Sequence, residues 1–198
     1  DWNYSEIYEA IAAKIPNLPC QVQGDRTVSW GEFDRRSNAL ARAFLAAKFP
    51  AQAKVAVYLR NCPEFIESYV ACFKAKLAPL NVNYRYGYDE LVHVLGNSDA
   101  EAIIFHASYA PMVGELREHL PRLRYFVAVE DGSPLPPWAE SYDAVVLANI
   151  PAYKLESRQM MLLRNSVRDL GAGLCMIGGD YSFGPGGYFQ TPIEEALP

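Results

Sequence analysis

The chain has 198 residues, of which 51% are hydrophobic and 21% charged, a composition that can fill the core of a globular α/β domain. Its formal net charge is −5, and its basic residues are scattered, with Arg35–Arg36 as the only adjacent pair. Nucleic-acid binding requires clustered Lys and Arg against phosphates, so this charge pattern excludes a nucleic-acid partner.

Cysteine usage and the absence of a long apolar run indicate where the protein resides. The four cysteines lie far apart, and no CxxC or Cys/His cluster has metal-ligand spacing, so we expect free thiols and no metal site. Residues 1–4 lead directly into an amphipathic pattern, which predicts no signal peptide. No apolar stretch approaches the roughly 18 residues of a membrane span. The sequence therefore predicts a cytoplasmic protein. The cysteines are Cys20, Cys62, Cys72 and Cys175.

The first 130 residues alternate between strand-like and helix-like patterns. Gly24-Asp25 predicts a two-residue hairpin turn between two short strands. In the helix that follows, Asp34, Arg35 and Arg36 are expected to point away from the apolar positions. The predicted strands are 20–23, 26–30, 54–59, 78–82, 102–105 and 125–129. The predicted helices are 5–16, 31–47, 63–76, 89–95 and 108–119.

This alternation is typical of one fold class. Strands that alternate with helices of these lengths predict an α/β fold with a mainly parallel, doubly wound sheet and helices on both faces, plus a small N-terminal β-hairpin. If the sheet is incomplete, its unpaired edge would promote self-association.

A proline-rich segment interrupts the pattern and divides the chain. Residues 131–141 hold the turn formers Asp131-Gly-Ser-Pro-Leu-Pro-Pro137 and predict a linker between a domain over 1–130 and a segment over 142–198. Beyond it, the sequence predicts further elements and a glycine-rich loop: strand 144–148, helix 156–170, strand 174–177 and loop 178–187.

Three stretches of the first domain resemble a known family. Residues 24–33, 54–65 and 73–86 are similar, in the expected order, to conserved segments of the AMP-dependent acyl-CoA synthetases of the adenylate-forming superfamily. Within that superfamily, Asn81–Arg85 looks most like the fatty-acyl-CoA synthetases. The family usually has glycine where Lys76 stands, at a helix-to-strand corner that suits a positive φ.

The resemblance implies ATP-dependent conversion of a small-molecule carboxylate into an acyl-CoA, with ATP, Mg and CoA as cofactors. The family's phosphate-binding loop, rich in Ser, Thr and Gly and ending in Pro-Lys-Gly, has no counterpart in this sequence, nor has its late catalytic lysine. We therefore expect an N-terminal fragment that is inactive alone, with catalytic and cofactor-binding residues unknown. The alternative is a noncatalytic α/β scaffold or binding module.

The tail carries a second resemblance. Residues 142–151, 167–188 and 191–198 are similar to part of a class I glutamine-amidotransferase-like domain, which makes the chain an apparent hybrid and an amidotransferase-like fragment a third alternative. Cys175 is then a candidate nucleophile, but Met176-Ile177 continues the strand where a sharp turn is needed, which favours core packing. Loop 178–187 could bind an anion through backbone N–H groups, but it lacks P-loop residues, which favours a structural turn.

Three histidines and one loop are the remaining candidates for a site. His93, His106 and His119 lie on separate predicted elements, so a shared metal site is not expected. Among the three, His106 is the best candidate because ligands of doubly wound sheets bind at the C-terminal ends of strands, but a capped loop histidine is the favoured interpretation. The loop Tyr84-Arg85-Tyr86 could contact an acyl chain or a nucleotide, but the favoured interpretation is a loop that packs on the remainder of a synthetase.

Overall fold

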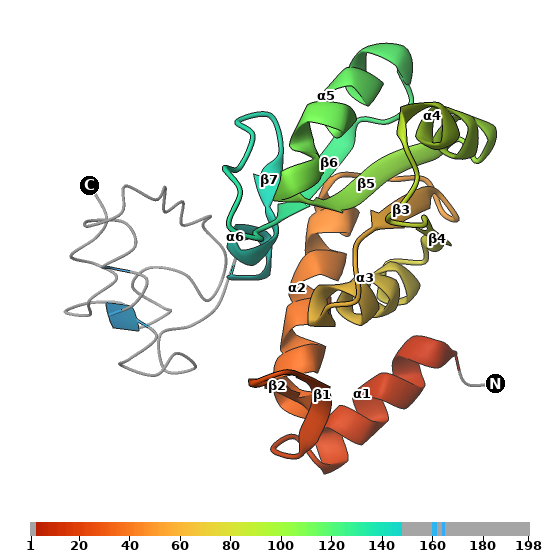
Figure 1. Ribbon diagram of the computed structural model, residues 1–198. Helices are drawn as coiled ribbons and strands as arrows, with labels where there is room; N and C mark the ends of the chain where they lie inside the picture. Colours follow the sequence, from red (N-terminus) through yellow and green to blue (C-terminus); the bar gives the residue numbers. More distant parts are fainter. Residues whose placement is uncertain (1–2, 148–159, 162–163, 165–198) are drawn as a thin grey trace. The chain divides into compact units, whose positions relative to one another are not determined.

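The computed structural model describes residues 3–147, 160–161 and 164 (Figure 1). Residues Asp1–Val146 form one compact unit, and Leu147–Pro198 form a second. In the second unit, the described residues Met160, Met161 and Arg164 are helical, as the predicted helix over 156–170 requires. The predicted strand 174–177, loop 178–187 and Cys175 lie outside the described residues.

A five-stranded parallel sheet forms the centre of the first unit (Figure 1). Its strand order is β4-β3-β5-β6-β7, so the chain moves from β3 to one neighbour, β4, and then returns to the other side of β3. This topology confirms the predicted doubly wound sheet. The strands are β3 (Lys54–Tyr58), β4 (Ala78–Asn81), β5 (Ala100–His106), β6 (Tyr125–Val129) and β7 (Glu140–Ser141).

Helices cover both faces of this sheet, as predicted. Successive side chains of a strand point to opposite faces. Val55 and Val57 of β3 pack with helices α2 (Trp30–Ala46) and α3 (Pro63–Lys74). Ala56 and Tyr58 instead pack with α4 (Tyr88–Asn97) and α5 (Ala110–His119), which follows the short 3-10 helix η1 (Ala107–Tyr109). Burial on both sides explains why the central strands read as continuous apolar runs.

A two-stranded antiparallel hairpin lies beside the N-terminal helix α1 (Tyr4–Lys14). Its strands are β1 (Pro19–Gln23) and β2 (Arg26–Ser29), paired through Gln23 and Arg26. Gly24 has φ 56° at the first position of the turn, a conformation that glycine adopts without steric cost. The Gly-Asp turn predicted from the sequence is therefore confirmed.

Lys76 adopts the positive φ that the sequence comparison predicts for this corner. Helix α3 ends at Lys74, and Lys76 has φ 57°. The Lys76 N–H donates to the Phe73 carbonyl at 3.2 Å and the Leu77 N–H to the Cys72 carbonyl at 2.8 Å. These two bonds are those of a Schellman motif, in which the residue at the Lys76 position is usually glycine.

The strand predicted over 144–148 is wrong, because the structure has helix α6 (Tyr142–Leu147) there. Tyr142 and Val145, three residues apart, are both buried in the core formed with α2 and α3, and that spacing is helical. A short apolar run fits a buried strand or a buried helix equally well, so its composition did not distinguish them.

The proline-rich segment packs on the sheet instead of standing clear of it. Trp138 stacks on Phe105 of β5 with 5.7 Å between ring centroids and meets Phe126 of β6 edge-on at 5.6 Å. Strand β7 then pairs with β6 through Val127 and Glu140. Residues 131–141 therefore contribute to the same core as the strands that precede them.

Candidate functional site

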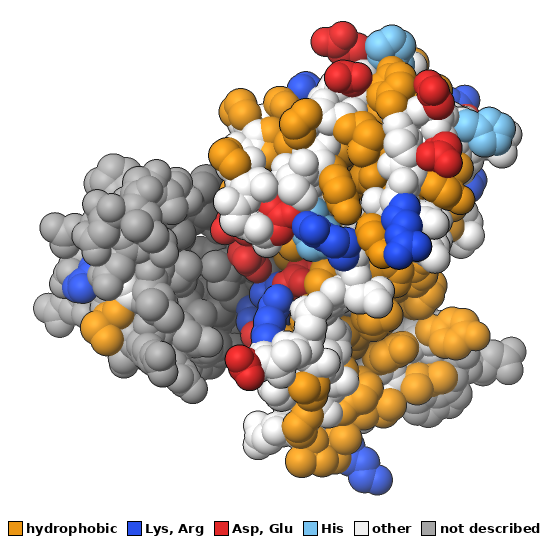
Figure 2. Space-filling view, viewed as in Figure 1, with side chains coloured by type: hydrophobic (Ala, Val, Ile, Leu, Met, Phe, Trp, Pro, Cys, Tyr) orange, Lys and Arg blue, Asp and Glu red, His pale blue; other side chains and the backbone are white. Residues whose placement is uncertain are grey.

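Polar side chains gather where the parallel strands end. In a doubly wound sheet, ligands bind at the carboxyl ends of the strands, at the point where the strand order reverses. Here that point lies between β3 and β5. A hollow of about 450 Å³ opens there, and Figure 2 shows basic and acidic side chains side by side near the middle of the visible face. We call it the switch-point hollow; it is lined by Gln23, Arg26, Arg60, Asn61, Cys62, Glu64, His106, Val129, Glu130 and Asp143.

An ion pair ties together the segments that follow β3 and β6. Arg60 Nη2 lies 2.7 Å from Asp131 Oδ2, and its guanidinium carbon lies 5.6 Å from the ring centre of Tyr109. Asp131 Oδ1 accepts hydrogen bonds from the backbone N–H groups of Ser108, at 3.2 Å, and Ser133, at 3.3 Å. Burial raises the pKa of Asp131, but these donors outweigh it, so the pKa lies below its ordinary value.

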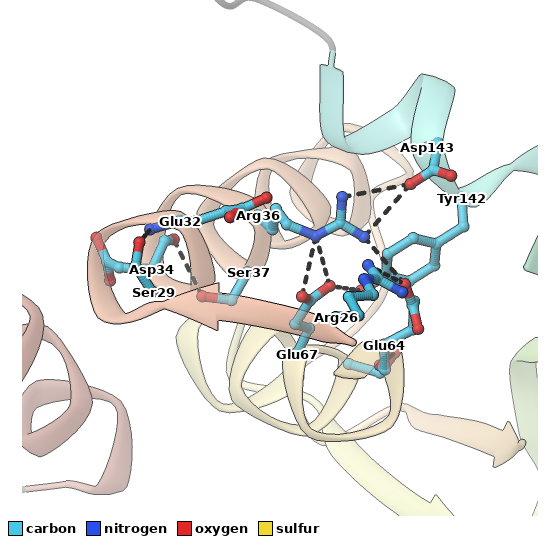
Figure 3. Close-up of polar contacts among 11 residues, drawn as sticks. Arg26, Ser29, Glu32, Asp34, Arg36, Ser37, Glu64, Glu67, Tyr142 and Asp143 are labelled. Atoms are coloured by element: carbon cyan, nitrogen blue, oxygen red, sulfur yellow. Dashed lines mark hydrogen bonds and ion pairs between the residues drawn. The ribbon is translucent and has the colours of Figure 1, made fainter. Parts of the chain in front are cut away.

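A second, buried cluster lies next to the hollow and joins α2, α3 and α6 (Figure 3). Arg36 Nε lies 2.9 Å from both carboxylate oxygens of Glu67, which is fully buried. The guanidinium also contacts Glu64 Oε1 and Asp143 Oδ1, each at 3.3 Å. The Tyr142 hydroxyl donates to Glu67 Oε2 at 3.0 Å. Arg36 therefore ties helix α6 to the two long helices.

The carboxylates of this cluster have pKa values shifted in opposite directions. Burial raises the pKa of Glu67 above its ordinary value, although Arg36 and Tyr142 both donate to it. Burial also opposes ionisation of Glu64, but the ion pair with Arg26, at 2.7 Å, and the neighbouring Arg36 outweigh it, so the pKa of Glu64 is lowered. Every charge of the cluster thus has a partner, as buried charges require.

Neither this cluster nor the burial of Arg36 was predicted from the sequence. Arg36 was expected to point away from the apolar face of its helix, but it is only 7% exposed. The available signal was in α3, where Glu64 and Glu67 are three residues apart and so share one helix face with buried residues. Two carboxylates on a buried face require a cation opposite them.

The three histidines lie on three different elements of the first unit. His93 is exposed on α4, and His119 places Nδ1 3.0 Å from the Glu115 carbonyl at the end of α5. His106 ends β5, lines the hollow and caps no backbone N–H with its side chain. In the part of the chain that the structure describes, no group of three or more His, Cys, Asp or Glu is placed to hold a metal ion.

The cysteines that the structure describes offer no thiolate nucleophile. Of the four cysteines, the three that the structure describes are free, and burial raises the pKa of Cys62 to about 12 and that of Cys20 to about 11. These thiols are therefore protonated at neutral pH.

In the loop between β4 and α4, Arg85 lies over the ring of Tyr84 at 5.2 Å. None of the described helices combines the length and apolar character needed to cross a bilayer.

Comparison with known proteins places the first unit in one family. The family described as AMP-binding enzyme matches residues 8–161. The chain is 37% identical over 140 residues to the medium-chain acyl-CoA ligase Mig of Mycobacterium avium, a match that covers 64% of this chain and 26% of the ligase. It is 29% identical over 159 residues to the 3-oxocholest-4-en-26-oate–CoA ligase of Rhodococcus rhodochrous, covering 79% of this chain and 29% of that ligase.

A solved structure has the same fold. The crystal structure of the anthranilate CoA ligase AuaEII in complex with anthranoyl-AMP superposes with a TM-score of 0.68 at 18% identity, over 73% of this chain and 28% of that one. The chain thus spans less than a third of the length of the two curated ligases. The family match begins in α1 and continues past α6. The chain belongs to the AMP-binding enzyme family.

Proposed function

We propose that this chain is the N-terminal part of an AMP-forming acyl-CoA ligase, a protein that activates a carboxylate with ATP and transfers the acyl group to CoA. The observation that carries the proposal is the family match over residues 8–161, together with the names of the curated relatives, which are acyl-CoA ligases. The described unit would form one wall of such an enzyme, with its parallel sheet and its paired helices.

The substrate class proposed is a medium- or long-chain carboxylate. Two features support it: the medium-chain acyl group in the name of the Mycobacterium avium relative, and the Asn81–Arg85 segment, which resembles fatty-acyl-CoA synthetases. ATP, Mg and CoA would be the cofactors of the complete enzyme.

The chain on its own is proposed to be inactive. Charge stabilisation around a transferring phosphate needs preorganised cationic and N–H donors. The sequence contains no Pro-Lys-Gly, and the arginines at the switch-point hollow are already paired, Arg26 with Glu64 and Arg60 with Asp131. The described residues therefore do not fit a triphosphate, and we derive no chemical step through ATP.

ATP–pyrophosphate exchange tests this proposal. The chain alone, incubated with octanoate, palmitate and benzoate, is expected to give no exchange above a protein-free blank, while the Mycobacterium avium ligase serves as positive control. Robust exchange by the chain alone would contradict the proposal that the chain is inactive on its own.

We further propose that the tail, from about residue 142, derives from an amidotransferase-like domain, joined through residues 131–141 to residues 1–130. This division concerns the origin of the sequence, since by packing the first unit extends to Val146. Support comes from the sequence of residues 167–188, whereas the AMP-binding match runs on to residue 161. A glutaminase assay on the chain and on Cys175→Ala tests the catalytic version. A glutaminase signal that is lost in Cys175→Ala supports a catalytic role of Cys175. An equal signal in the unchanged chain and in Cys175→Ala contradicts it.

Two properties of the whole molecule are proposed with it. A cytoplasmic location is supported by the free state of Cys20, Cys62 and Cys72. Self-association through the sheet is supported by β4, an edge strand in the described sheet. Sedimentation velocity at rising concentration measures the second; a monomer throughout would contradict it.

A further inference from the structure

Helix α3 has the reverse of the polarity expected of a surface helix. Its polar side chains are buried: Glu64 is 5% exposed, and Glu67 and Ser68 are 0% exposed. The side chain of Lys74 is also only 5% exposed. A helix at the surface of a soluble protein normally turns such residues to water and buries its apolar ones.

The outward side of α3 is instead apolar. Ile66 is 41% exposed, and three aromatic residues of the helix are partly exposed. At 3.6 residues per turn, these four residues lie within an arc of about 100°, and no charged residue of α3 falls inside that arc. Figure 2 shows hydrophobic side chains gathered over the part of the molecule where Figure 1 places α3. We call this surface the α3 face; it consists of Phe65, Ile66, Tyr69 and Phe73.

The rings of the α3 face form one continuous row. The ring centroids of Phe65 and Tyr69 are 5.1 Å apart, and those of Tyr69 and Phe73 are 6.4 Å apart. Tyr4 of α1, which is 69% exposed, extends the row, with its ring centroid 5.7 Å from that of Phe73. Single exposed apolar residues need no explanation, but a contiguous row of them marks an interaction surface.

The chemistry of the α3 face determines which kind of partner fits it. The centres of protein interfaces are rich in aromatic residues and poor in charge, as this face is. Helices that lie on a membrane carry Lys and Arg beside their apolar side, whereas the one basic residue of α3, Lys74, is buried against Asp34 at 2.6 Å. The face therefore favours an apolar protein surface over a lipid surface.

The α3 face is complementary to itself. Phe65, Tyr69 and Phe73 follow one another at intervals of four residues, so the row has an aromatic ring at its centre and at each end. A two-fold axis beside Tyr69 would bring this ring against its own copy, and Phe65 of each chain against Phe73 of the other. The two helices would then be antiparallel, an arrangement that places opposite ends of their dipoles together.

The exposed area of the row determines how tightly two copies can bind. From the exposed fractions of its members and the 150–250 Å² of a whole aromatic side chain, each copy would bury roughly 400 Å². A pair of copies would bury roughly 800 Å² in total, below the 1,200 Å² of stable complexes and within the range of weak ones. The dimer is therefore expected to form at micromolar concentrations.

We propose that two copies of this chain associate through the α3 face into a weak two-fold dimer. This surface is separate from the outer edge of β4, through which strands could pair. The inference does not rest on the proposed function, because a chain with or without ATP–pyrophosphate exchange can associate in this way.

Sedimentation velocity on the intact chain, from about 1 to 200 μM, tests the proposal. The expected result is a reversible monomer–dimer equilibrium with a dissociation constant on the order of 10–100 μM. Because the contact is apolar, raising NaCl from about 0.1 to 0.5 M is expected not to weaken it.

Three matched variants locate the interface. Ile66→Glu places a carboxylate in the proposed contact and is expected to weaken the dimer by at least about tenfold, because the charge loses its water. Leu45→Glu changes the isomeric side chain on α2, 61% exposed, and is expected to leave the dissociation constant unchanged. Asn81→Glu adds the same charge on the edge strand β4 and is also expected to change nothing. Far-UV circular dichroism checks that each variant is folded.

Hydroxyl-radical footprinting of the unaltered chain gives a second measurement. Between the lowest and highest concentrations, Tyr69 is expected to lose reactivity, because its ring becomes covered in the dimer. Tyr84, 39% exposed in the loop between β4 and α4, is the internal control and is expected to react equally at both.

Three results would overturn the proposal. The first is a monomer at every concentration, which would leave the α3 face to another partner, such as the remainder of a ligase. The second is a dimer that Ile66→Glu weakens no more than Leu45→Glu does. The third is a dimer in which Tyr69 stays as reactive as in the monomer, or which Asn81→Glu dissociates and Ile66→Glu does not. Footprinting decides the question even if Ile66→Glu fails to fold.

Discussion

Replacing Lys76 with glycine is expected to stabilise the first unit. The residue has φ 57° in the motif that ends α3, and its side chain is exposed, so the substitution removes no buried contact. A left-handed conformation costs a residue with a Cβ about 1–2 kcal/mol, and glycine avoids this cost. Glycine also loses about 0.5–1 kcal/mol of stability, because its unfolded chain is more flexible. We expect a net gain in the free energy of unfolding of about 0.5–1 kcal/mol.

Urea unfolding, followed by far-UV circular dichroism, measures this gain. With a denaturant dependence of about 2 kcal/mol per molar, Lys76→Gly should raise the midpoint by about 0.3–0.5 M. Lys76→Ala is the matched control, because it removes the same charge but keeps the Cβ, and it is expected to leave the midpoint nearly unchanged. If alanine stabilises as much as glycine, the effect comes from charge and the backbone argument fails.

Three further changes probe the buried cluster and the proline-rich segment. Arg36→Met leaves the carboxylate of Glu67 buried without its cation and should cost about 3–5 kcal/mol in urea unfolding; adding Glu67→Leu should restore much of it, and no recovery would contradict the pairing. Because the pKa of Glu64 lies below its ordinary value of 4.5, the ionised carboxylate stabilises the fold fully above about pH 4.5. This stabilisation is lost as the pH falls through the lowered pKa. Glu64→Gln should therefore destabilise at pH 7 by an amount that shrinks below about pH 4.5, whereas a pH-independent difference would refute it. Trp138→Ala removes the ring packed on Phe105 and should cost about 2 kcal/mol, whereas a free linker would lose under about 0.5 kcal/mol.

The elements that the sequence predicted well are those in which local pattern and tertiary environment agree. Strands β3, β5 and β6 are buried on both faces, so their apolar density alone identified them. The Gly24 turn and the Lys76 corner were predictable because each depends on a backbone conformation that few residues adopt freely.

The errors arose where a distant partner determines the local structure. Helix α6 forms from a run that also suits a strand, and its helical state follows from contacts of Tyr142 with α3 and of Asp143 with α2. Arg36 looked solvent-facing because the carboxylates that bury it are about 30 residues further along the chain. His106 was singled out for its place at a strand end but interpreted as a capped loop histidine. The structure shows no such cap, and only the packed structure reveals that its ring nitrogens have no hydrogen-bond partner among the described residues.

The most direct test of the central claim is to place the described unit inside a working ligase. Residues 8–146 would replace the matching segment of the Mycobacterium avium ligase, to which the chain is 37% identical, and ATP–pyrophosphate exchange would be measured with a medium-chain acid. The ligase lacking that segment is the negative control. We expect the chimera to catalyse ATP–pyrophosphate exchange and the chain alone not to catalyse it. A folded chimera without exchange would contradict the proposed function.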